Sequence, residues 1–246
     1  MNHEIALTPQ KNRRVLALGL LLLLGVIWGS GYSIAKLAMQ NGVAPLGYSF
    51  WQSIGPAILV TIAALFYDLR LHLNREHIIY YFICGLVGLT IPNTTMYFVA
   101  PHIPAGVLGV VVNTVPVITY FIALCVGQEK FNWARFIGVM IAMLGILLII
   151  IPKASLPTED MVPWVLAALI APIGFALCII YIAQRKMDGS VLSHSAGMLF
   201  SSSLLLIPLV FSTHQFYPLH PPLHLAGWLI ILEILVIPGT TVVGFL

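Results

Sequence analysis

Charged residues are scarce in this chain. Only 8% of its 246 residues are charged, with 11 Lys or Arg and 8 Asp or Glu, while 60% are hydrophobic. A soluble globular domain carries about a quarter charged residues, because it must cover its surface with them. The composition therefore excludes a water-soluble domain and indicates a protein that crosses a membrane several times, with the lipid bilayer as a partner.

Cysteine is also rare, and nucleotide-binding motifs are missing. Cys84, Cys125 and Cys178 fall in separate apolar runs without a Cys-x-x-Cys spacing. This pattern gives neither a disulfide framework nor a metal site, so we interpret the cysteines as packing residues. No P-loop is present. We therefore predict no cofactor, no metal, no catalytic residue and no enzymatic activity.

Long apolar runs are what the chain does have. A membrane-spanning helix needs roughly 20 apolar residues, and the period of two that marks barrel strands is absent here. The first run follows KNRR, as a signal peptide would, but it exceeds the about 7–15 apolar residues of a cleavable signal. We predict an all-α polytopic membrane fold with eight helices, at 15–35, 46–67, 78–98, 106–126, 133–151, 163–184, 192–211 and 225–246.

The basic residues sort to one side of this arrangement. If the chain crosses at every predicted helix, nine of the eleven Lys and Arg fall on one side, and only Lys36 and Lys153 fall on the other. The positive-inside rule then places the N-terminus in the cytoplasm, with the inner membrane as the expected location. The net charge of +3 is an orientation signal and predicts no nucleic-acid partner. The nine are Lys11, Arg13, Arg14, Arg70, Arg75, Lys130, Arg135, Arg185 and Lys186.

The two halves of the chain resemble each other. IPNTTMYF at 91–98 and IPGTTVVGF at 237–245 share Ile-Pro-x-Thr-Thr at an offset of 146, and 28–42 matches 175–189 at an offset of 147. Two anchors with nearly one offset predict an internal duplication. A five-helix unit crosses an odd number of times, so its second copy must be inverted. Inverted repeats are typical of secondary transporters.

The second copy is incomplete. The first repeat continues beyond its IPNTT motif to residue 152, whereas the sequence stops just after the second motif. We expect a cytoplasmic segment at 1–14, a five-helix repeat at 15–152, an outer linker at 153–162 and a partial, three-helix second repeat at 163–246. Extrapolation to a full second repeat predicts ten helices and roughly 300 residues.

The first repeat resembles the EamA-type transporters of the drug/metabolite transporter superfamily. The likeness lies in WGSGYSIAK at 28–36 and in VVNTVPVITYFIALCVGQEKFNWARFIGVMIAMLGILLIIIP at 111–152. Pro116, Gly127 with Glu129, and the spaced Gly138 and Gly145 occupy the family's motif positions. The resemblance implies an inverted-repeat transporter. It covers 15–152 well and 163–246 more loosely.

Three residues on helices 1 and 2 are candidates for a solute pathway. Trp28 and Tyr32 are four apart and share a face next to Gly25 and Gly29, which form a GxxxG pattern for close helix contact. The alternative for both aromatics is packing or an interfacial belt. Gln52 stands near the place where many EamA relatives carry an arginine. Lys36 is expected to extend to the lipid headgroups.

Two prolines mark further candidates on helices 3 and 4. Pro92 and Pro116 each remove a backbone hydrogen bond, and Asn93 and Asn113 lie beside them. Polar side chains at a broken turn either line a cavity or satisfy the freed backbone, and we favour a pathway role for both asparagines. Tyr97 joins them as a candidate.

Two threonines follow the first of these prolines. Thr94 and Thr95 are expected to bond back to their own helix.

Glu233 is the only acidic residue well inside a predicted helix. An ionised carboxylate there costs on the order of 3 kcal/mol unless it is paired or protonated. It is therefore a candidate for proton coupling or for binding a solute amine. The alternative is an interfacial position, if its helix begins later than residue 225.

The resulting hypothesis is a secondary transporter that exports small-molecule solutes such as amino acids by alternating access, with protons as a coupling ion. A truncated membrane protein that transports nothing is the main alternative, and a homodimer that completes the pathway is a variant of the transporter. A membrane-embedded enzyme is the weakest alternative, because the cytoplasmic loops hold only scattered charges.

Overall fold

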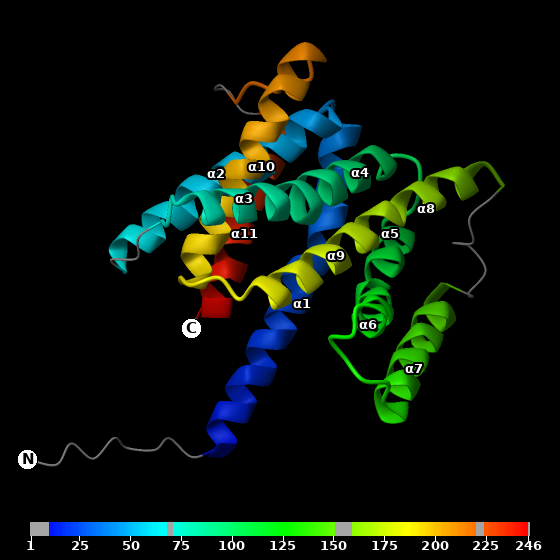
Figure 1. The fold of residues 1–246 in the computed structure, drawn as a ribbon. Coiled ribbons are helices and arrows are strands. Elements are labelled where there is room, and N and C mark those ends of the chain that lie inside the picture. Colours follow the sequence, from blue (N-terminus) through cyan, green and yellow to red (C-terminus); the bar gives the residue numbers. More distant parts are fainter. Residues whose placement is uncertain (1–9, 68–70, 151–158, 220–223, 246) are drawn as a thin grey trace, which may run out of the picture.

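The chain folds into helical rods. The structure is a computed structural model that describes residues 10–67, 71–150, 159–219 and 224–245, and within them every regular element is a helix (Figure 1). The helices join end to end into eight rods, which confirms the predicted all-α fold. In chain order the rods are α1 (Gln10–Gln40), α2 (Pro45–Phe66), α3 (Arg75–Gly85) with η1 (Leu86–Thr90) and α4 (Ile91–Val99), α5 (Ala105–Val112) with α6 (Val115–Cys125), α7 (Trp133–Ile150), α8 (Val162–Ala168) with α9 (Ile170–Arg185), α10 (Val191–Ser212), and α11 (Leu225–Phe245); a 3₁₀ turn, η2 (Glu159–Met161), precedes α8.

The rods have the length and surface of membrane spans. Among the described residues, five segments are long and apolar enough to cross a membrane. Large apolar side chains cover their outer faces, with Phe66 85% and Leu204 67% exposed. A soluble protein would bury such a surface. The chain is therefore a multi-pass membrane protein. The five segments are Pro45–Phe66, Arg75–Val99, Ala105–Cys125, Val162–Arg185 and Val191–Ser212.

The third and fourth rods are interrupted where the sequence places its prolines. Before Pro92 the helix widens into the π-helical turn η1, and the Ile91 amide donates to the carbonyl of Leu86, five residues back. The break near Pro116 falls at Asn113 and Thr114, between α5 and α6. There the Thr114 hydroxyl donates to the Val111 carbonyl at 2.6 Å. Such irregular turns are frequent at functional positions.

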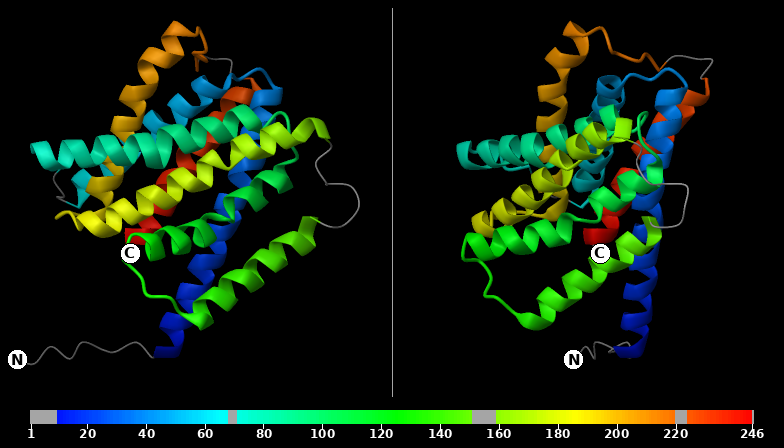
Figure 2. Two further views of the ribbon diagram at one scale, coloured as in Figure 1. Left: turned by 45° about the vertical axis from the view of Figure 1, so that its right-hand side comes forward. Right: turned by 90° about the vertical axis from the view of Figure 1, so that its right-hand side faces the viewer.

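The contacts between helices are those expected if the two halves of the chain have related structures. By the sequence offset, α1, α2 and α3–α4 correspond to α8–α9, α10 and α11. The corresponding helices α2 and α10 pack along each other (Figures 1 and 2). The contact of α1 with α11 corresponds to the contact of α9 with α4. The contact of α2 with α11 corresponds to the contact of α10 with α3. Each of these contacts thus has a counterpart in which the halves are exchanged, a pattern that agrees with two related halves.

Hydroxyl groups join the two halves at their centre. The Ser202 hydroxyl on α10 lies 3.0 Å from the Ser53 hydroxyl on α2, and it accepts a hydrogen bond of 2.9 Å from Thr90 in η1. All three side chains are buried. Hydrogen bonds between helices contribute on the order of 0.6 kcal/mol each in membrane proteins, so the cluster mainly fixes how the helices register.

Glycines allow the closest helix contacts, although not all at the expected place. A Cβ atom on Gly85 of α3 would lie 2.8 Å from the Met198 carbonyl oxygen and 3.0 Å from the Ser202 amide nitrogen of α10. Gly25 and Gly29, by contrast, have no described atom within 4 Å of a built Cβ. The predicted glycine contact face on helix 1 is therefore not used within the described residues, and the N-terminal part of α1 extends away from α10 and α11 (Figure 1).

Adding one methyl group at Gly85 tests the α3–α10 contact. We expect Gly85→Ala to destabilise the protein by about 1–3 kcal/mol, because the methyl group would press on the backbone of α10. The measurement is the thermal unfolding midpoint in detergent. Gly109→Ala is the matched control, since its Cβ would meet nothing within 4 Å. Equal midpoints for the two variants would contradict the packing described.

Candidate functional site

A buried carboxylate lies where three helices meet. Helix α11 begins at Leu225, so Glu233 is inside the helix, and its side chain is only 5% exposed. Its Oε1 atom accepts a hydrogen bond of 3.2 Å from Gln52 Nε2 on α2. On the other side, a Cβ atom on Gly31 of α1 would lie 3.1 Å from the same oxygen. The absence of a side chain at Gly31 therefore lets α1 approach the carboxylate.

Three tyrosines come from the helices next to this carboxylate. Tyr48 on α2 and Tyr97 on α4 share a core cluster with Ile230, which lies one turn before Glu233, and Tyr32 directly follows Gly31 on α1. The rings of Tyr48 and Tyr97 pack edge to face, with centroids 4.8 Å apart, and both side chains are buried. We refer to Glu233, Gln52, Tyr32, Tyr48 and Tyr97 as the Glu233 cluster. Its members come from four helices of the bundle.

The cluster contains polar atoms that lack a partner. Glu233 Oε2, Gln52 Oε1 and the Tyr48 hydroxyl are buried and have no hydrogen-bond partner among the described residues. Buried polar groups in proteins are nearly always paired, and leaving one unpaired costs about 1–3 kcal/mol. Three of the five such atoms in the described residues belong to this cluster, which makes it the candidate site.

The cluster unites four of the seven residues proposed from the sequence. Tyr32, Gln52, Tyr97 and Glu233 belong to it, although they lie far apart in the chain. Tyr48 was not predicted. It lies four residues before Gln52 and so shares its face of α2, the same spacing that connects Trp28 with Tyr32, and this signal could have found it.

The other three proposed residues are placed differently. Asn93 is partly buried on α4, one helical turn before Tyr97 on the same face. Asn113 is exposed at the joint between α5 and α6, so nothing brings it to the Glu233 cluster. The side chain of Trp28 lies outside the described part of the chain.

Two expectations about side-chain partners were wrong. Lys36 does not extend to the headgroups; its Nζ donates a 2.7 Å hydrogen bond to the Ile103 carbonyl, which the turn between α4 and α5 leaves free. Thr94 does not bond back to its own helix but shares a 2.9 Å hydrogen bond with Ser49 of α2. Thr95 donates to the Ile91 carbonyl, as expected. Both corrected contacts join separate rods.

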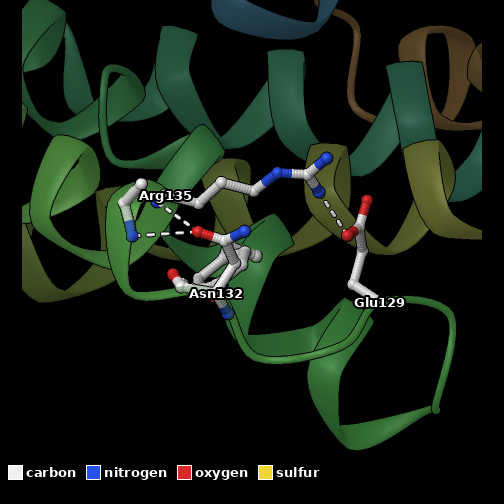
Figure 3. A network of polar contacts seen from close by, with 5 residues as sticks. Glu129, Asn132 and Arg135 are labelled. Carbon is white, nitrogen blue, oxygen red and sulfur yellow. Dashed lines mark hydrogen bonds and ion pairs between the residues drawn. The ribbon is translucent and has the colours of Figure 1, made fainter.

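The ion pair recorded in the described residues lies away from the cluster. Arg135 pairs with Glu129 at the exposed turn between α6 and α7, where Asn132 Oδ1 also accepts from the amides of Ala134 and Arg135 (Figure 3). Exposed pairs of this kind contribute little stability. No described cation pairs with Glu233, so the carboxylate lacks a counter-charge among these residues.

Histidines form a second polar group where α3 begins and α9 leads into α10. His77 Nε2 and His194 Nε2 lie 2.8 Å and 3.1 Å from the Asp188 carbonyl oxygen, and the His72 ring stacks on His77. These contacts attach the link between α9 and α10 to the start of α3. No group of His, Cys, Asp or Glu in the described residues has a geometry suited to a metal ion. We interpret the histidines as structural.

Removing an unpaired hydroxyl should stabilise the protein. We expect Tyr48→Phe to raise the thermal unfolding midpoint, by about 1 kcal/mol of stability, because it deletes a buried group without a partner. Tyr120→Phe is the matched control. The Tyr120 hydroxyl accepts from the Asn132 amide at 3.1 Å, so its loss should lower the midpoint by a similar amount. A lower midpoint for Tyr48→Phe would show that its hydroxyl is paired.

Comparison with known proteins places the fold in a family. A profile of the EamA-like transporter family matches residues 15–151. A WAT1-related protein of Arabidopsis thaliana is 24% identical over 140 residues, which are 52% of this chain; the chain spans only 38% of that relative. A protein of known crystal structure has the same fold, with a TM-score of 0.63 at 15% identity over 89% of this chain and 78% of its own. Since the family profile covers more than half of the sequence, the chain belongs to the EamA-like transporter family, within the drug/metabolite transporter superfamily.

Proposed function

We propose that the protein is a secondary transporter that exports a small metabolite, such as an amino acid, and that the Glu233 cluster lies on the solute pathway. The observation that carries this proposal is the convergence of three candidate residues around the buried carboxylate of a fourth, Glu233. Intramembrane carboxylates in transporters usually mark a solute or proton path. The family supports the general class of activity, and the cluster supports the location of the path.

The position of the cluster suits alternating access. Tyr32, Gln52 and Tyr97 come from the first half of the chain, whereas Glu233 comes from α11 in the second half. In inverted-repeat transporters one repeat rocks against the other around a site near the membrane midplane. A movement of α11 against α1 and α2 would change the partners of Glu233, and with them its access to either side.

Glu233 also has the properties of a proton carrier. An isolated ionised carboxylate inside the membrane costs on the order of 3 kcal/mol, so occlusion favours its protonated form. Exposure to water on either side of the membrane would remove this penalty and release the proton. A cycle of occlusion and exposure would thereby couple proton movement to solute movement.

Proton coupling predicts a loss of gradient dependence when Glu233 is neutralised. In proteoliposomes, flux of a labelled mixture of small amino acids and amines should rise several-fold when a proton gradient is imposed. Glu233→Gln should leave a flux that is independent of the proton gradient, because the glutamine amide does not bind a proton at the pH values of such an assay. Glu129→Gln, on the exposed turn, should retain the full response.

Two outcomes separate the parts of this proposal. Full gradient dependence in Glu233→Gln would overturn proton coupling by this residue. No flux of any labelled solute in the unaltered protein would overturn the transport proposal itself.

We also propose a cytoplasmic N-terminus in the inner membrane. Arg185 and Lys186 end α9 on the side where the basic residues gather, and Thr213 follows α10 on the opposite side. The excess of Lys and Arg on one side supports this orientation.

Cysteine labelling tests the orientation. In a background lacking the native cysteines, Thr213→Cys should react with a membrane-impermeant maleimide added to intact cells. Arg185→Cys should react only after lysis, since both positions are exposed and differ only in side. The reverse pattern would place the N-terminus outside.

A further inference from the structure

The unpaired atoms of the Glu233 cluster are chiefly acceptors. Gln52 donates through Nε2 to Glu233 Oε1, and its carbonyl oxygen Oε1 has no donor among the described residues. Glu233 Oε2 has no donor among them either. An amide oxygen accepts only, and so does an ionised carboxylate. The Tyr48 hydroxyl is the third unpaired group and serves either role. The group that completes this cluster must therefore donate several hydrogen bonds.

The cluster also lacks positive charge. Lys36 lies one turn after Tyr32 on α1, but its Nζ is held by the Ile103 carbonyl. Arg135 is paired with Glu129 on a distant turn. Within the described residues no cation pairs with Glu233, so a cationic ligand would be favoured by the carboxylate.

Aromatic rings add to the same preference. Tyr48 and Tyr97 are almost fully buried at 1% and 3% exposure, and Tyr32 on α1 packs against a core cluster that includes Met96 and Val99, the neighbours of Tyr97 on α4. The face of a tyrosine ring attracts a cation, most strongly when both are removed from water. A carboxylate beside several such rings, with spare acceptors, has the chemistry of an amine site.

We infer that the solute of this site carries a primary ammonium group and no carboxylate. An ammonium group supplies three N–H donors and one positive charge, which match Glu233 Oε2, Gln52 Oε1 and the Tyr48 hydroxyl. A quaternary ammonium has the charge but no N–H donor. The carboxylate of an amino acid would need a cation or donors, and the cluster offers mainly acceptors.

This inference deepens the proposed transport function and depends on it for its biological meaning. It narrows the solute class from small metabolites in general to small organic amines, and it replaces the amino acid given above as an example. A proton alone is the competing occupant. On Glu233 Oε2 a proton would supply one hydrogen bond and leave at least one of the other two polar atoms without a partner.

Four small molecules with the same carbon chain test the inference. Butylamine carries the ammonium alone, butyltrimethylammonium keeps the charge without N–H groups, norvaline adds a carboxylate, and pentanoate has only the carboxylate. Binding is measured on the purified full chain by the shift of the thermal unfolding midpoint with ligand concentration at neutral pH. Butylamine should bind at least tenfold more tightly than norvaline or butyltrimethylammonium, and pentanoate should not bind.

Two variants test whether binding occurs at this cluster. Glu233→Gln should weaken butylamine binding at least tenfold, because it removes the charge while keeping the shape. Gln52→Met removes one acceptor and should weaken it several-fold, which provides a second variant if the first fails to fold. Glu129→Gln should bind butylamine as the unaltered protein does.

The outcomes separate this inference from the transport proposal. Norvaline binding as tightly as butylamine, or no midpoint shift with butylamine, would overturn the amine inference. A midpoint that responds to acid but to none of the four molecules would identify the proton as the only occupant and overturn it as well. Counterflow of labelled norvaline but not of labelled butylamine in proteoliposomes would keep transport and overturn the amine class. Specific butylamine binding without counterflow would keep the amine site and overturn transport.

Discussion

A lipid bilayer offers no hydrogen bonds, and this constraint governs the whole structure. Every polar group within a membrane-spanning segment must find its partner inside the protein. Most do so across helix contacts: Ser53 and Thr90 meet at Ser202, and Lys36 reaches the Ile103 carbonyl. Each contact stabilises one packing arrangement by satisfying a group that lipid would leave unpaired. Against this background, unpaired polar atoms at one position are unusual.

Three of the five unpaired buried atoms in the described residues belong to the Glu233 cluster, where the two halves of the chain meet; the other two are the hydroxyls of Tyr81 and Thr119. Helix α11 contributes Glu233, and the first half supplies Gln52 and the tyrosines around it. At other places the two halves pack closely because small residues lie between them, as Gly85 does against α10. The packing is tight at Gly85 and α10, whereas the polar pairing is incomplete at the Glu233 cluster. In the proposed transport cycle, the halves would move about the hydroxyl cluster while the partners of Glu233 change.

The sequence predicts the rods far better than it predicts their partners. Eight apolar runs become eight rods because hydrocarbon thickness and backbone pairing leave little choice of length or element. The interruption before Pro92 is likewise local, since it follows from one missing N–H. Thr94 and Lys36 were assigned wrongly because their partners lie on other rods, and only packing decides which carbonyl or hydroxyl comes within reach. Gly25 and Gly29 show the same limit: the GxxxG pattern is visible in the sequence, but its contact is not made within the described residues.

The Glu233 cluster could be predicted from the sequence only in part, less well than the rods and better than the side-chain partners. Glu233 could be recognised alone, because a carboxylate in an apolar run is costly wherever the helix packs. Its neighbours could be proposed as polar or aromatic residues on helical faces, but their convergence depends on how α1, α2, α4 and α11 register. The unpaired atoms could not be predicted at all, since pairing is a property of the packed state. They cost about 1–3 kcal/mol each, which is large beside a typical folding stability of about 5–15 kcal/mol. Replacing Tyr48 by phenylalanine would remove one of these costs without changing the shape of the cluster. A stable scaffold alone does not need that hydroxyl, whereas a site that exchanges partners during transport does.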